Sequence, residues 1–472
     1  MIVVDGRHLS TRDIAVLAHR GDTADIAAEA RERMLASYEF GERTVTQRPI
    51  YGRSTGVGAN RDVVLADPDA QADALMRSHA TTAGELRSRE RIRAMLAVRL
   101  NQLASGGSGA SPAVLDALHR MLADDCLPPV RELGSIGTGD LPALAITALA
   151  LAGLVPTMPP IATTVPMGIG DALPFMSSNA ATIGDAALAV VDVRDLAYSA
   201  LVVGALTFVA VDGNIEAFDP AVELVTPFEG SRFVCRTIRR LVSSDQRAAR
   251  IQDQFGLRTL PQVHGALLDQ LALLDRTIVG MANAPAENPV LLPQLGLAHH
   301  GGFHAAHLAQ SLDSTALSIA EAAQLSFARL TMLSEPAVTG LPAFLGDGTP
   351  GASGVMVVEY VAASALARLR AAATPASLQS VTLSRGIEED ASIAALAAVQ
   401  VMQAVADLRV VVACELVAAV RCIRMRLLTA PAGLVAALAD CAKLSADIHD
   451  RDLTEDLDVA GEILRDLVVS AA

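Results

Sequence analysis

The octapeptide Gly-Ser-Ile-Gly-Thr-Gly-Asp-Leu at residues 134–141 follows one predicted helix and opens another. Glycine lets a backbone turn tightly enough for a peptide nitrogen to approach a neighbouring carbonyl carbon. Two structures fit this stretch. One is a buried tight turn, which Gly-x-Gly before a helix usually forms. The other is a self-modifying turn, in which the Gly139 nitrogen attacks the Gly137 carbonyl and Thr138 loses its hydroxyl as water, leaving an electrophilic alkylidene imidazolone.

Outside this octapeptide, the hydrophobic pattern predicts an all-α fold built as an elongated helical bundle. Alternating Val, Ile and Thr stretches are almost absent, and the last long segment exceeds about 25 residues, which is typical of a helix that spans a bundle. Hydrophobic residues make up 51% of the chain and Trp is absent, which suits closely spaced helices. Apolar residues recur at helical spacing over 262–282, 303–334, 353–373 and 391–428.

The first part of the chain predicts shorter helices separated by loops. Ser10 and Asp13 form a capping-box pattern ahead of a helix that ends at His19. Ser111 followed by Pro112 predicts a capped helix start. No linker divides the 472 residues, so we expect one body, 1–472, with the active-site loops in about 1–190 and the long helices in about 191–472. Further helices are expected over 22–39, over 68–80 with His79 near its end, and over 85–103 with its arginines on the solvent side.

Composition excludes several classes of partner. A net charge of -15 is spread over the whole chain, which argues against nucleic acid. Five widely spaced cysteines and no recognisable signal peptide predict a reduced, cytoplasmic protein. Mean hydropathy is +0.39, but prolines interrupt the uncharged run 141–170, and the part before Pro156 is shorter than the roughly 20 residues that a membrane span needs. We therefore expect a buried helix followed by a loop, and no membrane partner.

Two segments carry candidate substrate-handling groups. Tyr51 lies in a glycine-rich loop between helices, where its phenol could act as an acid or base or simply pack at the surface. Arg258 lies in a polar segment before a helix, where it could hold a carboxylate with its planar fork of donors or form a structural salt bridge. Both alternatives remain open at each position.

Two polar clusters have simpler interpretations. The histidines of 299–307 lack a nearby cysteine or carboxylate to complete a metal shell, so we expect no metal. Glu388, Glu389 and Asp390 precede the longest predicted helix, where negative charge suits the helix N-terminus.

Taken together, these stretches resemble the aromatic amino acid lyase family, of which histidine and phenylalanine ammonia-lyases are familiar members. The resemblance runs from Tyr51 to Ser392 and implies a helical homotetramer whose active sites are shared between subunits. It also implies a self-made methylidene-imidazolone that helps to expel ammonia from an amino acid. The matching blocks are Tyr51-Gly with Thr55-Gly-Val-Gly, Gly134-Ser-Ile-Gly with Gly-Asp-Leu, Gln252-Asp to Gln262-Val-His-Gly, Glu287-Asn-Pro, Gly301-Gly-Phe-His, Ser353-Gly-Val-Met and Pro375-Ala-Ser.

The sequence departs from the family at the electrophile. The family pattern Gly-Ser-Val-Gly-Ala-Ser-Gly-Asp-Leu is one residue longer, and Gly137-Thr138-Gly139 stands in place of its cyclising Ala-Ser-Gly. Ser177 replaces an asparagine that polarises the electrophile, and Phe255 replaces a tyrosine. Tyr51, His79, Arg258 and Glu388 stand where the family keeps its acid/base, polar and carboxylate-binding groups, and Gln262 joins Ser177, Phe255 and Arg258 as a candidate substrate-binding residue.

These observations predict an enzyme that performs elimination, addition or a related cyclisation on a small molecule with a carboxylate. Tyr51 is expected to be the general acid or base, with its pKa lowered by nearby cations. Arg258 is expected to hold the carboxylate, and no cofactor is expected, the imidazolone included. One alternative is a true ammonia-lyase or aminomutase with a Thr138-derived imidazolone. Another is a catalytically inactive homologue retained for binding or assembly.

Overall fold

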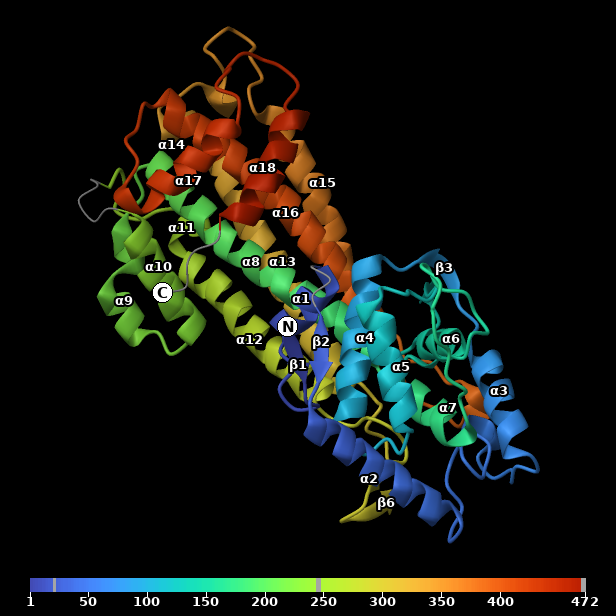
Figure 1. Cartoon of the computed structure of the whole chain (residues 1–472). Helices are drawn as coiled ribbons and strands as arrows, with labels where there is room; N and C mark the ends of the chain where they lie inside the picture. Colours follow the sequence, from blue (N-terminus) through green and yellow to red (C-terminus); the bar gives the residue numbers. More distant parts are fainter. Residues whose placement is uncertain (20–22, 243–247, 468–472) are drawn as a thin grey trace. The chain divides into compact units, whose positions relative to one another are not determined.

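The computed structural model describes residues 1–19, 23–242 and 248–467. These residues are mostly helical, which confirms the predicted fold class, and their strands form three two-stranded sheets. Among them, no helix has the length and apolar character needed to cross a membrane. The chain is coloured along its length in Figure 1.

The chain divides into two compact units. Unit 1 comprises Met1–Val191, Leu274–Asp313 and Pro375–Val399, and unit 2 comprises Asp192–Leu273, Ser314–Thr374 and Gln400–Ala472. Four long helices contribute residues to both units: α8 (Ala180–Ala210), α12 (Leu260–Ala282), α13 (Ala306–Leu333) and α16 (Ala394–Met425). The prediction of one body stays a prediction.

Unit 1 is organised around α4 (Arg89–Ala104), which is buried from Ile92 to Ala104. Its polar side chains Arg93 and Arg99 are 1% and 0% exposed, so the prediction that this helix turns its arginines to solvent is wrong. Their guanidinium groups donate to backbone carbonyls and acidic side chains inside the unit. The other helices of unit 1 are α1 (Thr11–His19), α2 (Ala28–Val45), α3 (Pro68–His79), α5 (Pro112–Ala123), α6 (Leu141–Leu151) and α7 (Ile169–Met176), with short turns η1 (Gly58–Asn60), η4 (Ala376–Leu378) and η5 (Ser384–Gly386).

Short strands account for two differences from the predicted helices. The segment 22–39 does not form one helix: Asp22 lies outside the described residues, and β2 (Ala24–Ile26) pairs in parallel with β1 (Ile2–Val4) before α2 begins. The segment 85–103 starts as β3 (Ala83–Leu86), which pairs antiparallel with β4 (Arg131–Leu133), so α4 begins only at Arg89. Three- or four-residue strands show too little alternation to be distinguished from a helix by period. The third sheet pairs β5 (Val290–Leu292) with β6 (Gly296–Ala298).

The predicted helix starts are partly confirmed. Ser10 and Asp13 exchange hydrogen bonds as a capping pair, with each backbone N–H donating to the other side chain. Ser111 precedes α5 as predicted, but its side chain makes no capping hydrogen bond. Its backbone N–H instead donates to Asp171 Oδ1 at 2.7 Å, so this loop is tied to α7.

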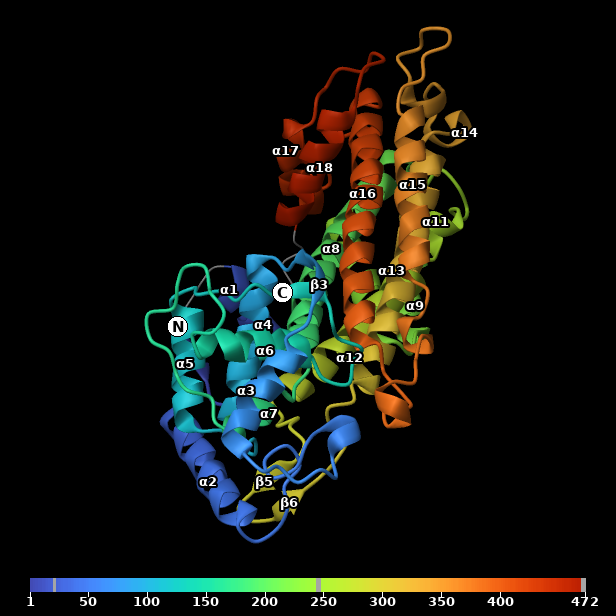
Figure 2. The same cartoon turned by 90° about the vertical axis from the view of Figure 1, so that its right-hand side faces the viewer.

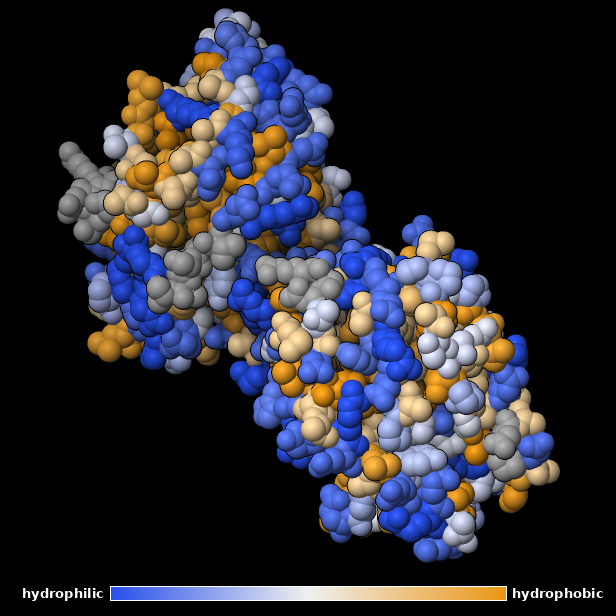
Figure 3. Space-filling view, viewed as in Figure 1, coloured by the Kyte–Doolittle hydropathy of each residue, from blue (hydrophilic) through white to orange (hydrophobic). Residues whose placement is uncertain are grey.

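Unit 2 contains the long helical segments that the apolar period predicts, including the 32-residue α16, of which all but the first turns belong to this unit. The views in Figures 1 and 2 both show α15 (Met356–Ala372) beside α16. In α9 (Pro220–Val225), Leu224 and Val225 are 80% and 79% exposed, and Figure 3 shows hydrophobic residues among hydrophilic ones on this part of the surface. The remaining helices are α10 (Glu229–Leu241), α11 (Phe255–Arg258), α14 (Pro336–Thr339), α17 (Val435–Asp440) and α18 (Thr454–Asp466), with turns η2 (Ile215–Phe218), η3 (Ala343–Leu345), η6 (Ala432–Leu434) and η7 (Cys441–Lys443).

Candidate functional site

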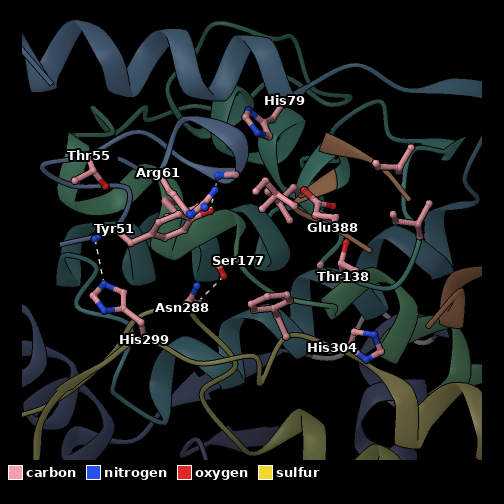
Figure 4. Close-up of a pocket in the computed structure, with 18 of the residues that line it drawn as sticks. Tyr51, Thr55, Arg61, His79, Thr138, Ser177, Asn288, His299, His304 and Glu388 are labelled. Carbon is pink, nitrogen blue, oxygen red and sulfur yellow. Dashed lines mark hydrogen bonds between the residues drawn. The ribbon is translucent and has the colours of Figure 1, made fainter. Parts of the chain in front are cut away.

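A cavity of about 1040 Å³ lies within unit 1 and brings together segments that are far apart in the sequence. Figure 4 shows the side chains that surround it. Six predicted site residues line this cavity: Tyr51, His79, Thr138, Gly139, Ser177 and Glu388. The structure therefore joins the loop after α2, the end of α3, the octapeptide, the end of α7 and the loop before α16.

The octapeptide is held by hydrogen bonds on both sides of Thr138. The Gly137 carbonyl accepts from Ser392 Oγ at 2.9 Å and from the Ala305 N–H at 3.2 Å. The Gly139 N–H donates to Asn179 Oδ1 at 3.1 Å. The nitrogen and the carbonyl that a cyclisation would join therefore each have another partner in the intact peptide.

Gly137 leaves no room for the alanine of the family pattern. Its φ is +86°, and a Cβ at this position would lie 2.1 Å from Ser392 Oγ and 2.8 Å from the Ala394 nitrogen. L-residues with a side chain rarely adopt this backbone conformation. The turn therefore does not fit the Ala-Ser-Gly arrangement from which the family's imidazolone is built.

Asp140, the seventh residue of the octapeptide, is fully buried and fixes the turn to α8. Its carboxylate accepts from the Thr182 N–H at 2.7 Å, from the Thr182 hydroxyl at 2.9 Å, and from the Ser135 hydroxyl. Burial raises the pKa of Asp140, while these donors act in the opposite direction. We interpret Asp140 as a structural anchor for the turn.

Tyr51 enters the cavity from a loop that needs glycine beside it. Gly52 has φ +72°, and a Cβ there would lie 2.0 Å from the Leu173 side chain. The Tyr51 hydroxyl accepts from the Gly58 N–H at 2.8 Å, and the Tyr51 N–H donates to His299 Nε2 at 3.3 Å. These contacts fix both the phenol and its backbone.

The environment of Tyr51 raises the pKa of its phenol. Burial is the main cause, and the negative charge of Glu388 acts in the same direction. The Gly58 N–H and the positive charge of Arg61 oppose them but are outweighed. The prediction that nearby cations lower this pKa is therefore wrong, because the loss of water around the phenol exceeds the attraction of one guanidinium. Tyr51 is a phenol, not a phenolate, at neutral pH.

His79 presents one ring nitrogen that remains available for proton transfer. Its Nδ1 lies 2.9 Å from the Leu75 carbonyl and 3.1 Å from Ser78 Oγ. A carbonyl can only accept, so Nδ1 carries the proton in the neutral ring and Nε2 keeps its lone pair. Figure 4 shows His79 on a different side of the cavity from Tyr51.

Ser177 and Asn288 form one wall of the cavity. The Asn288 N–H donates to Ser177 Oγ at 3.2 Å, and Asn288 Oδ1 accepts from the His300 N–H at 3.0 Å. Sequence reasoning did not single out Asn288, although it lies in the Glu287-Asn-Pro block. Arg61 was also missed, because nothing in its local sequence distinguishes it from a solvated surface charge.

Three of the histidines in 299–307 have partners other than a metal. His299 accepts from Tyr51, His300 Nε2 donates to the Glu287 carbonyl at 2.7 Å, and His304 Nε2 lies 3.4 Å from Asp390 Oδ2. Within the described ranges, no three His, Cys, Asp or Glu side chains gather as a metal-binding group.

The other predicted substrate-binding residues belong to unit 2, and none of them lines this cavity. Arg258 lies 4.7 Å over the ring of Phe255 and donates to Gln252 Oε1. Phe255 is 65% exposed, and Gln262 is also exposed at the start of α12. The structure thus brings the acid/base candidates together in unit 1 and keeps Arg258, Phe255 and Gln262 in a separate group.

Comparisons with known proteins give one family. The family model described as aromatic amino acid lyase matches residues 9–443. The chain is 31% identical to a histidine ammonia-lyase of Symbiobacterium thermophilum, over 99% of this chain and 97% of that protein.

Solved structures give the same fold. An ergothionase of Treponema denticola superposes with a TM-score of 0.91 at 22% identity and covers 100% of both chains. A phenylalanine aminomutase of Pantoea agglomerans superposes with a TM-score of 0.93 at 21% identity and covers 98% of this chain and 99% of the other. The family model and the sequence match along the whole length show that the chain belongs to the aromatic amino acid lyase family and is an enzyme of the lyase type.

Proposed function

We propose that the cavity of unit 1 catalyses the elimination of an amine from a small carboxylate-bearing substrate, or the reverse addition or a related cyclisation. The observation that carries this proposal is the meeting of Tyr51, His79 and Glu388 in one cavity with Thr138. A proton donor and a proton acceptor are both needed when a C–H bond and a C–N bond break together. The histidine ammonia-lyase relative makes histidine the first substrate to test.

In the proposed reaction, His79 is the base and Tyr51 is the acid. His79 Nε2 takes a proton from the carbon next to the one that bears the amine, the electrons of that C–H bond form the C=C bond, and the C–N bond breaks. The departing nitrogen takes the Tyr51 phenol proton. The raised pKa of Tyr51 supports this role, because a phenol that keeps its proton at neutral pH is ready to donate it. Glu388 favours the protonated phenol through its negative charge.

We further propose that the Gly137-Thr138-Gly139 turn is an intact peptide in the mature enzyme. The hydrogen bond from the Gly139 N–H to Asn179 Oδ1 supports it, because the nitrogen that would attack is held by another partner. Thr138 also carries a methyl group that stiffens its rotamer and crowds the compression that cyclisation requires. In other family members the imidazolone supplies an electrophile, and the scheme above uses none.

The alternative is a true ammonia-lyase or aminomutase with an imidazolone derived from Thr138. The two donors on the Gly137 carbonyl favour this alternative, because they would polarise that carbonyl toward attack. Intact-mass measurement separates the two. A protein of the sequence mass supports the intact turn. A protein lighter by two waters, with near-ultraviolet absorbance that borohydride removes, makes the alternative correct.

Arg258 is proposed to bind the substrate carboxylate from a second copy of the chain within a homotetramer. The resemblance implies shared active sites, and the partial exposure of Arg258 beside the exposed Phe255 supports it. Five cysteines that are all buried and unpaired in the described structure support a reducing, cytoplasmic location.

The test is turnover of a panel of amino acids. Turnover is measured by the release of ammonia and by the ultraviolet absorbance of the unsaturated acid product. Tyr51→Phe and Arg258→Ala should each abolish turnover while the protein stays folded. Co-expression of the two variants should restore part of the activity, because some sites then combine an intact Tyr51 from one copy with an intact Arg258 from another. Absence of turnover and of ligand-induced thermal shift across the panel would favour the inactive homologue. Activity lost in both variants but not restored by mixing would contradict the shared site.

A further inference from the structure

A buried ion pair lies behind the Ser177–Asn288 wall of the cavity. Arg99, on α4, is 0% exposed, and its NH1 donates to Glu287 Oε1 at 2.7 Å, where Glu287 is 1% exposed. Neither Arg99 nor Glu287 lines the cavity. This pair therefore has no direct access to a substrate.

The same guanidinium holds the end of α7. Arg99 Nε donates to the Phe175 carbonyl at 2.9 Å, and its NH2 donates to the Pro174 carbonyl. These carbonyls precede Ser177 by two and three residues in the chain. Beside them, Gln102 Oε1 accepts from the Ser178 hydroxyl at 2.5 Å, so α4 fixes both sides of Ser177.

Glu287 fixes the other half of the wall. It is the residue before Asn288, and its backbone carbonyl accepts from His300 Nε2 at 2.7 Å. One planar group on α4 thus connects two segments whose lining residues, Ser177 and Asn288, are 111 positions apart in the chain. Arginine suits this task because its rigid fork offers five donors in fixed directions.

We propose that the Arg99–Glu287 pair is a positioning device that sets the distance and orientation of Ser177 and Asn288 in the cavity. Burying an ion pair is costly compared with burying apolar side chains of similar size, so such a pair is weak support for stability alone. Arg99 contacts carbonyls at the end of α7 and the carboxylate of Glu287, so the pair fixes the position of one segment relative to the other. This inference rests on the proposed function, because Ser177 is a substrate-binding candidate there.

The test compares two isosteric substitutions of buried acids in the same unit. Glu287→Gln weakens the pair behind the wall. Asp185→Asn is the matched control: Asp185 is 0% exposed, and its partners Arg87 and Arg91 do not line the cavity. Both variants should lower the melting temperature, because each leaves buried guanidinium charge less well compensated.

Hydrogen exchange followed by mass spectrometry measures the amide protection of the Ser177–Asn288 wall and needs no substrate. In Glu287→Gln, amide protection in the peptides around Ser177 and Asn288 should fall by about tenfold more than elsewhere in unit 1. In Asp185→Asn it should not fall selectively there. Equal loss of protection in the two variants, or no local loss in Glu287→Gln, overturns the proposal.

Kinetics add a readout that a merely structural pair would not change. With the substrate found in the panel, Glu287→Gln should lower kcat per folded enzyme by about tenfold or more, whereas Asp185→Asn should not. The kcat effect of Glu287→Gln should largely disappear in a Ser177→Ala background, because both changes damage the same contact. Additive effects on kcat overturn the proposal. A wild type without turnover contradicts the proposed function, and the exchange experiment then still decides the positioning role.

Discussion

His264, on α12, makes the stability of the folded chain depend on pH. Its side chain is 1% exposed, and neither ring nitrogen has a hydrogen-bond partner among the described residues. Burial, helped by the positive charge of Arg329, lowers the pKa of His264 from its ordinary 6.5 to about 3. The folded chain therefore holds the neutral ring.

The magnitude follows from proton linkage. Between pH 6.5 and about 3, the unfolded chain binds a proton at His264 that the folded chain does not bind. The contribution of this ring to stability is thus fully present above the unfolded pKa and is lost as the pH falls below it. From about pH 7 to about pH 5, His264 alone should lower the free energy of unfolding by about 2 kcal/mol.

The assay is urea unfolding, followed by circular dichroism at fixed protein concentration, at both pH values. His264→Leu removes the titration at similar volume and breaks no hydrogen bond, so the variant should lose about 2 kcal/mol less stability than the wild type on acidification. His8→Leu is the control, because the His8 side chain is 80% exposed, and it should follow the wild type. Equal losses in the wild type and His264→Leu would refute the burial of a neutral ring.

Three further outcomes are expected. Gly137→Ala should destabilise the protein and abolish turnover, because the added Cβ would overlap Ser392. Gly280→Ala, whose added Cβ would lie in open space on α12, should instead stabilise the protein by about 0.5–1 kcal/mol. Melting curves and the panel assay check both variants. Ultraviolet difference titration of the wild type against Tyr51→Phe should show that the Tyr51 phenol ionises above pH 10.0, and a transition below pH 10.0 would remove it as the acid. Light scattering of dilute protein should give a tetramer, and a stable folded monomer would contradict the shared site.

The long helices could be predicted from sequence because a 3.6-residue period repeated over twenty or more residues is a strong signal. α12, α13, α15 and α16 begin and end within three residues of the predicted segments. The strand Ala24–Ile26 could not be predicted, because three residues carry no period and its pairing partner is β1.

The candidate site also has features that the sequence could predict and features that it could not. A family block identifies Tyr51, and the resemblance places His79 and Glu388 where the family keeps polar and acid/base groups; the fold gathers all three in one cavity. The pKa shift of Tyr51 depends on burial by segments distant in sequence, so its direction could not be obtained locally. Arg99 illustrates the same limit, because an arginine in a helix is usually at the surface and only the packing around α4 makes it a buried contact.

Unit 2 repeats the arrangement found behind the cavity wall. Arg329 and Glu415 are both 0% exposed and form a two-pronged pair at 2.6 and 2.8 Å. The remaining Arg329 nitrogen, NH1, donates at 3.1 Å to the carbonyl of Gly256, which lies between Phe255 and Arg258 in α11. In each unit, a fully buried arginine, Arg99 or Arg329, thus pairs with a glutamate. Its other N–H groups donate to backbone carbonyls of a segment that carries substrate-binding candidates. Since replacing such pairs with apolar residues often costs no stability, their geometry rather than their energy explains why arginine is used at both places.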